Sequence, residues 1–332
     1  MHDFTDLIDV AAERLGGAVV AANDEFFAPK ERLLLASMPE WREGAYTERG
    51  KWMDGWETRR RRTPGHDWCI VRLGAPAVLR GAVIDTAWFR GNFPESCSLD
   101  GCAVNGTPDA STLVDESATR WAEIMKPLPL HGDARNAFPI TSSERVTHVR
   151  FNIYPDGGVA RLRLHGEIAP EPGALRPGAA VNLAAMELGA FVAVCSDMFF
   201  GHRQNLILPG RSTHMGDGWE TKRRRGPGHD WTIVRLAAAG VVDHLEIDTD
   251  HFKGNAPGEC SLDWARAPNA TASDLTSASQ EWLPLVPRSP LQPHARHRFA
   301  AERSAGTATH VRLNIFPDGG VARLRVLGRV AG

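Results

Sequence analysis

Residues 54–73 read DGWETRRRRTPGHDWCIVRL, and residues 217–236 read DGWETKRRRGPGHDWTIVRL. The two stretches are identical at 17 of 20 positions and lie 163 residues apart. Similarity at this level between distant segments of one chain indicates that a whole structural unit has been duplicated. We therefore expect the chain to contain two copies of one domain.

Three further blocks recur in the same order. Residues 84–100 match 247–263 at a spacing of 163, residues 148–168 match 310–330 at a spacing of 162, and residues 24–27 match 197–200 at a spacing of 173. The change in spacing from 173 to 163 places about ten extra residues in the first copy, within the segment 38–51, which we interpret as a loop.

The boundary between the copies is predicted from composition. Segment 169–178 (APEPGALRPG) is rich in proline and glycine, which is typical of an interdomain linker. We predict a first domain at 1–168, this linker, and a second domain at 179–332. A repeat of about 160 residues is too long for a solenoid or a propeller blade, so each copy is expected to be a complete domain.

Strands are predicted near the end of each copy. In 147–154 apolar and polar residues alternate, and the Pro-Asp-Gly-Gly sequence at 155–158 is a turn signal. Because 159–164 alternates again, we predict a β-hairpin here and at the matching place in the second copy. The only helix-like stretch is Leu7–Leu15.

Many short strands separated by glycine and proline predict an all-β protein. The order of the motifs, from Asp54-Gly55 through His66-Asp67-Trp68 to Gly91-Asn92 and the turn at 155–158, resembles the discoidin or galactose-binding type of jelly roll. The expected fold is two tandem jelly-roll β-sandwich domains that arose by internal duplication. That fold commonly presents its binding loops at one end of the sandwich.

The overall composition narrows the class of partner. The 332-residue chain has a formal net charge of -2, which provides no basic field for nucleic acid. No stretch approaches the roughly 20 apolar residues that cross a bilayer, and the N-terminal segment lacks the features of a signal peptide. Five cysteines without a CxxC pair indicate free thiols in a reducing compartment. We expect a cytoplasmic protein with a small-molecule partner.

The duplicated loop at 54–68 and its copy concentrate ionisable side chains. The catalytic candidates are Glu57, His66 and Asp67 with their counterparts Glu220, His229 and Asp230, and the anion-binding candidates are Arg61, Arg62, Arg224 and Arg225. Clustered arginines can grip a carboxylate through bidentate hydrogen bonds. Asn92 and Asn255, each preceded by glycine, are candidates for binding an amide-like group.

Each candidate also has a structural interpretation. The tryptophans of the loop are expected to be core anchors, His66 can bond a neighbouring strand, and the arginine run can be a solvated surface. The asparagines can stabilise left-handed turns. Cys97 and Cys260 are interpreted as buried small hydrophobes, since no basic residue adjoins them in sequence.

The predicted hairpin would place several polar side chains on one face of the sheet. We favour structural arginines that tie loops to the sheet as the interpretation of this face, which comprises His148, Arg150, Asn152, Arg161 and Arg163 with His310, Arg312, Asn314, Arg323 and Arg325 in the second copy.

The segments 6–34, 52–74, 84–101 and 148–168, with their recurrences in the second half, resemble the allantoicase family. The resemblance covers nearly the whole chain, and its most specific part is the duplicated DGWETxRRRxPGHDW. It implies a tandem jelly roll that assembles as a homo-oligomer and converts allantoate and water to ureidoglycolate and urea.

A mechanism for that reaction assigns a role to each candidate. Arg61, Arg62 and their counterparts would grip the allantoate carboxylate, and Asn92 or Asn255 would bind a ureido carbonyl. Histidine titrates near neutral pH, so His66 or His229 would protonate the departing urea, oriented by Asp67 or Asp230. Glu57 or Glu220 would deprotonate water or the remaining ureido nitrogen. On this scheme, His229→Ala and Glu220→Gln abolish urea release.

Three alternatives stay open at this level. The copies differ where Trp88 faces His251 and where 93–97 (FPESC) faces 256–260 (APGEC), so either copy could be silent. A divalent metal held by Glu57, His66 and Asp67 is an open cofactor assignment, because their spacing is not diagnostic. The rival function is a tandem carbohydrate- or small-anion-binding module without catalysis, against which the ionisable loop argues.

Overall fold

The computed structural model describes residues 4–302 and 306–332. The chain divides into two compact units, of which the first ends at Pro170 and the second begins at Glu171, a point inside the predicted linker. We call these units the first and second repeats. None of the helices in the described ranges is long and apolar enough to cross a membrane.

Most of the regular secondary structure of the first repeat is strand. Its strands are β1 (Ile8–Asp9), β2 (Ala18–Ala22), β3 (Tyr46–Thr47), β4 (Gly50–Lys51), β5 (Trp56–Glu57), β6 (Asp67–Asp85), β7 (Ser96–Cys102), β8 (Ala122–Pro129), β9 (Arg135–Pro139), β10 (Arg145–Tyr154), β11 (Gly158–Val159) and β12 (Arg161–Ile168), and its α-helix is α1 (Ala110–Val114). Short 3-10 helices cover Phe4–Asp6, Glu13–Leu15 and Lys30–Leu34.

The second repeat has a similar order of elements, but in its described residues it has no counterpart of β3 and β4. Its strands are β13 (Ala180–Asn182), β14 (Phe191–Cys195), β15 (Trp219–Glu220), β16 (Asp230–Asp248), β17 (Glu259–Ala265), β18 (Leu283–Pro290), β19 (Arg296–Ala300), β20 (Ala308–Phe316), β21 (Gly320–Val321) and β22 (Arg323–Val330), and its α-helix is α2 (Ala272–Thr276). Three 3-10 helices cover Met186–Leu188, Arg203–Ile207 and Met215–Asp217. The predicted all-β fold with two tandem sandwich domains of the jelly-roll class is confirmed.

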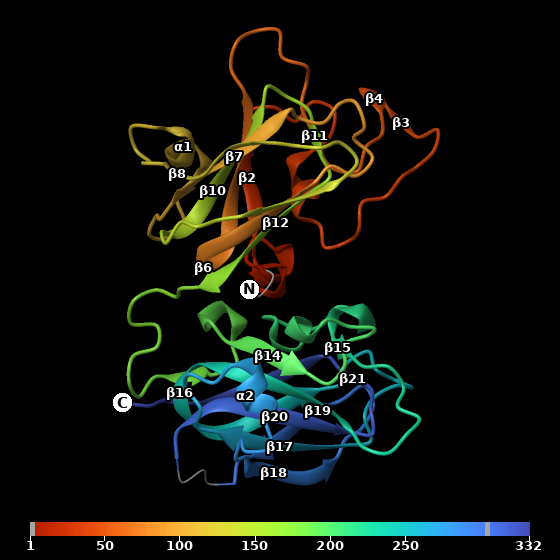
Figure 1. The fold of residues 1–332 in the computed structure, drawn as a ribbon, viewed down its shortest axis with the longest axis vertical. Helices are drawn as coiled ribbons and strands as arrows, with labels where there is room; N and C mark the ends of the chain where they lie inside the picture. The colour runs from red at the N-terminus through yellow and green to blue at the C-terminus, as the bar shows by residue number, and fades with distance from the viewer. Residues whose placement is uncertain (1–3, 303–305) are drawn as a thin grey trace. The chain divides into compact units, whose positions relative to one another are not determined.

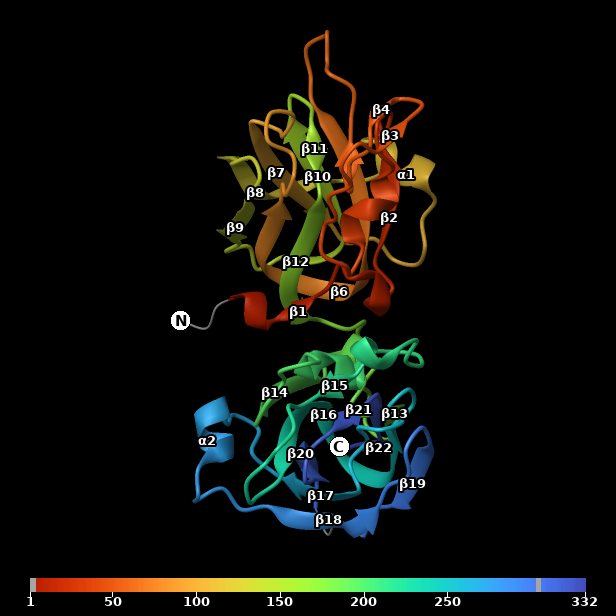
Figure 2. The same cartoon turned by 90° about the vertical axis from the view of Figure 1, so that its right-hand side faces the viewer.

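One long strand links the two layers of each sandwich. Residues 67–72 of β6 pair with β10, and β2 pairs with the same half of the strand, whereas residues 81–85 pair with β12 and β9. Residues 77 and 78 pair with β10 on one edge and with β12 on the other. β6 therefore passes from one layer to the other, as the curved ribbon in Figures 1 and 2 shows. β16 does the same in the second repeat, pairing first with β14 and β20 and then with β22 and β19.

This topology corrects the predicted hairpin. β10 pairs with β6 and β7, whereas β12 pairs with β6 and β1, so the two consecutive strands lie on opposite edges of β6 and, apart from residues 77 and 78, along different parts of it. The short strand β11 between them pairs with β5 instead. Alternation in the sequence predicts each strand but not its partner, so the proposed shared polar face does not exist. The prediction of a helix-like stretch at Leu7–Leu15 is also wrong, because these residues form β1 and a 3-10 helix.

Three loops of the first repeat meet at one end of the sandwich, where Figures 1 and 2 also place β3, β4 and β11. The Gly158 amide donates to the Asn92 carbonyl (2.8 Å), and the Thr58 amide donates to the Gly157 carbonyl (3.1 Å). A Cβ at Gly158 would lie 1.9 Å from the ring of Phe89, so only glycine allows this approach. The turn at 155–158 therefore holds the loops that follow β5 and β6 together.

Candidate functional site

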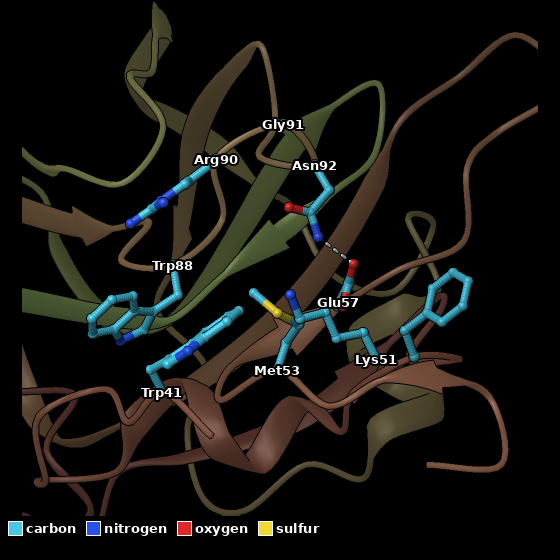
Figure 3. Close-up of a pocket in the computed structure, with 9 residues that line it drawn as sticks. Trp41, Lys51, Met53, Glu57, Trp88, Arg90, Gly91 and Asn92 are labelled. Atoms are coloured by element: carbon cyan, nitrogen blue, oxygen red, sulfur yellow. Dashed lines mark hydrogen bonds between the residues drawn. The ribbon is translucent and has the colours of Figure 1, made fainter. Parts of the chain in front are cut away.

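A buried carboxyl group lies at this loop end. Glu57 is held in β5 by pairing with Gly158 of β11, and its side chain is 9% exposed. The amide of Asn92 donates to Glu57 Oε1 at 2.6 Å, a contact drawn in Figure 3. Burial raises the pKa of Glu57, and the hydrogen bond from Asn92 opposes this only in part. The structure thus brings together two of the predicted site residues.

Glu57 and Asn92 open into a cavity of about 560 Å³. Figure 3 shows Trp41 and Trp88 forming one side of it, with ring centroids 5.6 Å apart and an interplanar angle of 32°. The Lys51 ammonium lies 4.2 Å from the centre of the Trp41 ring. The complete lining is Phe27, Trp41, Lys51, Met53, Glu57, Trp88, Arg90, Gly91 and Asn92.

The wall of this cavity comes from the extra residues of the first copy. Trp41 and Lys51 both lie in the segment 38–51, whose later part forms the paired strands β3 and β4. Trp88 is joined to the same segment, because its indole nitrogen donates to the carbonyl of Pro39 at 3.1 Å. The predicted insertion thus lines the cavity.

A second hollow of about 420 Å³ shares Phe27, Glu57, Gly91 and Asn92 with the cavity. Arg60 is among its other lining residues. Both hollows therefore have Glu57 and a cation in their walls, and in each the glutamate is one of the few buried ionisable groups.

The arginine run is split between paired and unpaired side chains. Arg59 Nη2 lies 2.6 Å from Asp24, and Arg61 Nη1 donates to buried Asp67 at 2.6 Å. Within the described ranges, Arg60 and Arg62 form no hydrogen bond or ion pair, and both are exposed. Arg61 lines the second hollow but is engaged by Asp67, and Arg62 lies outside both hollows. Arg60 lines the second hollow and is the unpaired arginine of the run that can face a ligand.

The structure does not place Asp67 on the ring of His66. Asp67 Oδ1 accepts from Arg61 and, at 3.0 Å, from Asn23. The His66 ring instead packs against Tyr154, with centroids 4.8 Å apart, and it lines neither hollow. In the parts of the chain that are described, the expected orientation of this histidine by the neighbouring aspartate is therefore not found.

The second repeat has the same contacts between glutamate and asparagine and between arginine and aspartate, but it lacks the segment that forms the cavity wall in the first repeat. Asn255 donates to the buried carboxylate of Glu220, and Arg224 pairs with Asp230. His229 Nε2 lies 3.3 Å from Asn314 Oδ1 rather than beside Asp230. Arg225 is exposed.

The missing wall leaves apolar residues exposed in the second repeat. Met53 corresponds to Gly216, and Trp88 corresponds to His251, whose Nε2 contacts the Ser212 carbonyl at 3.1 Å. Phe200, the counterpart of half-buried Phe27, is 62% exposed. The two repeats therefore share the Glu–Asn pair but differ in what surrounds it.

Other predicted structural roles are confirmed. Trp56 and Trp219 are completely buried, whereas Trp68 is only half-buried. All five cysteines are free thiols. Burial raises the pKa of both Cys97 and Cys260 to about 12, which keeps these thiols protonated and unreactive.

The arginines of β12 act as ties between loops and the sheet, as the sequence suggested. Arg161 is 2% exposed and bonds Asp54 at 2.7 Å as well as the Ser37 carbonyl at 3.0 Å. Burial alone would raise the pKa of Asp54, but the hydrogen bonds from Arg161 and the Glu40 amide hold it below its usual range. Arg163 reaches the carbonyl of Leu35 in the same way.

Within residues 4–302 and 306–332, no group of three or more His, Cys, Asp or Glu side chains is arranged to hold a metal ion. The Glu57, His66 and Asp67 set is accordingly not gathered at one point.

Several lining residues were not predicted as site residues from the sequence, among them Trp41, Lys51, Arg60 and Arg90. The change in repeat spacing was a signal for the first two, because it marked segment 38–51 as a feature of one copy. Arg60 and Arg90 carried no such signal, since the pairing that leaves Arg60 free and joins Arg90 to Asp133 depends on the folded structure.

The raised pKa of Glu57 gives a pH-dependent prediction. The folded state binds the Glu57 proton more tightly than the unfolded state, so the stability contributed by this group falls as pH rises from the ordinary glutamate pKa through the folded one. Glutamine does not titrate, so Glu57→Gln removes this loss of stability with pH. As pH rises from about 4 to about 8, the thermal midpoint of the variant should therefore rise relative to that of the wild type. A constant difference would contradict this.

Comparison with known proteins identifies relatives along the whole chain. A family model described as "Allantoicase repeat" matches residues 8–169 and 181–331. A protein from Pseudomonas aeruginosa named "Probable allantoicase" is 49% identical, with 98% of this chain and 96% of that protein covered. The "Allantoicase" of Dictyostelium discoideum is 44% identical, with 97% and 87% covered. A crystal structure of allantoicase from Saccharomyces cerevisiae is 36% identical, with a TM-score of 0.82 and 97% and 92% covered.

Proposed function

This chain belongs to the allantoicase family, and we propose that it hydrolyses allantoate to ureidoglycolate and urea in the cavity beside Glu57 of the first repeat. The observation that carries the proposal is the pairing of a buried carboxyl, whose pKa is raised by burial, with an amide at the wall of a cavity of small-molecule size. Relatives aligned over almost their full length support the activity.

The chemistry of the cavity suits this substrate. Allantoate has one carboxylate and two ureido groups on a single carbon, so its binding site needs a cation and groups that bond amides. Lys51 supplies positive charge in the cavity and Arg60 supplies it in the adjoining hollow, whereas the cavity-lining Arg90 is paired with Asp133 at 3.0 Å. Asn92 offers its amide to a ureido group, and the flat faces of Trp41 and Trp88 can pack against a planar one.

Glu57 can perform both proton transfers. In its protonated form it donates to the nitrogen of the departing urea as the carbon–nitrogen bond breaks, because urea leaves poorly as an anion. The resulting carboxylate then accepts a proton from the water whose oxygen forms the new bond to that carbon. The products are neutral urea and ureidoglycolate, and Glu57 regains its proton. Asn92 keeps the Glu57 carboxyl in one orientation throughout.

This scheme revises the roles expected from the sequence. His66 lines neither hollow and Asp67 is paired with Arg61, so Glu57 takes over the acid role proposed for the histidine. The second repeat keeps Glu220 and Asn255 but has no counterpart of the segment that supplies Trp41 and Lys51. We therefore place catalysis in the first repeat, and the expected effect of Glu220→Gln becomes small.

We further propose that the protein acts as a homo-oligomer in the cytoplasm. The oligomer follows from the family resemblance, and the compartment is supported by five cysteines that are all free thiols.

The activity itself is tested with the purified protein and allantoate. We expect one urea released for each allantoate consumed, together with ureidoglycolate. Repeating the assay after treatment with EDTA measures whether a divalent metal is required. Binding of allantoate without any urea release would favour the non-catalytic binding module instead.

A further inference from the structure

We propose that the second repeat binds a small organic carboxylate in a hollow of about 430 Å³ beside Arg312, distinct from the Glu57 cavity. Trp231 and Ile233 of β16 line this hollow together with Arg312 of β20. Trp282 and the segment 275–278, at the end of α2, complete most of the remaining wall.

Arg312 is only half engaged by the protein. Its Nε and Nη2 both donate to Asp263 Oδ2, at 3.0 and 2.8 Å, and its guanidinium lies 4.7 Å from the centre of the Trp282 ring. Within the described residues, its Nη1 has no hydrogen-bond partner, although the side chain is only 30% exposed. A fixed guanidinium with one free edge is a preorganised site for an anion.

The first repeat indicates which group fits that edge. Arg150, the counterpart of Arg312, also bonds an aspartate through Nε (Asp100, 3.1 Å) and lies 5.4 Å from the Trp121 ring. Its Nη1, however, donates to Glu116 at 3.0 Å. In the first repeat, the carboxylate of Glu116 therefore occupies the free edge of the arginine. Arg150 thus binds two carboxylates, those of Asp100 and Glu116.

The second repeat lacks this internal carboxylate. Asp115 is the C-cap residue of α1, and Glu116 follows it directly. Ser277 is the C-cap residue of α2, so the position equivalent to Glu116 is Ala278. Ala278 lines the hollow. The place that Glu116 fills is thus open in the second repeat, and a carboxylate from a ligand can take it.

The remaining walls define the rest of the ligand. The indole rings of Trp231 and Trp282 offer flat surfaces beside Arg312, and Thr276, Ser277 and Gln280 add polar groups to the wall. Such a site favours a carboxylate attached to a flat body over a free inorganic anion. Benzoate is a suitable probe, with benzamide as the uncharged control of the same shape.

The test is calorimetric titration with benzoate of the wild type and of Ala278→Glu, which copies Glu116 into the second repeat. We expect the wild type to bind benzoate in preference to benzamide, and Ala278→Glu to bind it about 10- to 100-fold more weakly, the loss expected for charge-assisted hydrogen bonds. Position 278 is exposed, so the variant should keep its thermal midpoint and its rate of urea release. Unchanged benzoate affinity in Ala278→Glu would overturn the proposal, as would the absence of benzoate binding to the wild type.

Two further titrations extend the test. Glu116→Ala should open the matching position beside Arg150 and add a second benzoate per chain. Allantoate titrated into Glu57→Gln, with and without Ala278→Glu, separates the sources of the carboxylate. If Ala278→Glu abolishes the binding of allantoate beside Arg312, the substrate itself is the ligand of this hollow. If the binding of allantoate is unchanged by Ala278→Glu, the ligand is a different carboxylic acid.

Discussion

Glu57→Gln is expected to slow urea release about a hundred- to ten-thousand-fold, the usual loss for a missing acid–base group. Glutamine keeps the shape of the side chain and can still accept the hydrogen bond that Asn92 now donates to Oε1. It cannot hold or give up a proton in the reaction. The measurement is the initial rate of urea formation from saturating allantoate, with the fold followed by its thermal midpoint.

The duplication provides a matched control. Glu220→Gln removes the equivalent carboxyl, which has the same burial and the same asparagine partner, from a repeat that lacks Trp41 and Lys51. We expect this variant to keep nearly the wild-type rate. An equal loss in both variants would place turnover in both repeats, and a loss confined to Glu220→Gln would reverse the proposed assignment.

Arg161→Met is expected to lower the free energy of unfolding of the first repeat by about 3–5 kcal/mol. The Arg161 guanidinium and the Asp54 carboxylate are both at most 5% exposed, and the change leaves Asp54 buried with only Arg32, 3.1 Å away, as a cationic partner. It also removes the bonds that tie Ser37 to β12, next to the segment that forms the cavity wall. The measurement is the shift in the denaturant midpoint of the first repeat.

Two variants control for general effects of losing an arginine. Arg60→Met removes an exposed, unpaired arginine and should change stability by less than about 0.5 kcal/mol. Asp54→Asn combined with Arg161→Met should cost less than the sum of the two single changes, because the pair is coupled. Additive losses would show that Arg161 acts by packing alone. Because the pKa of Asp54 is lowered, its contribution is present above the ordinary aspartate pKa and is lost as pH falls through the folded one.

Part of the site could be predicted from the sequence and part could not. Glu57 was a candidate because its duplicated loop concentrates ionisable groups, and Asn92 because its amide follows a glycine in both copies, and the two side chains lie in contact. His66 and Asp67 are adjacent in the chain, yet adjacent side chains on an extended segment point in opposite directions. Asp67 accordingly faces Arg61 while the His66 ring packs on Tyr154.

The free cation in the arginine run also depended on distant partners. Arg59 is neutralised by Asp24, 35 residues earlier in the chain, and Arg61 by Asp67, 6 residues later, while the Arg61 amide bonds Asp156, 95 residues later. The sequence does not show which arginine each aspartate pairs with, because that depends on how these segments fold against one another.

The sequence by itself determined the duplication, the all-β class, the position of the insertion and the loops that carry the ionisable groups. These follow from repetition and from local alternation of residue types, which the order of residues contains directly. The tertiary structure alone decided that β10 and β12 lie on opposite edges of β6, that segment 38–51 builds the wall beside Glu57, and that Arg60 and Arg312 keep unengaged donors. Pairing and burial are properties of contacts between residues far apart in the chain, so they appear only once the chain has folded.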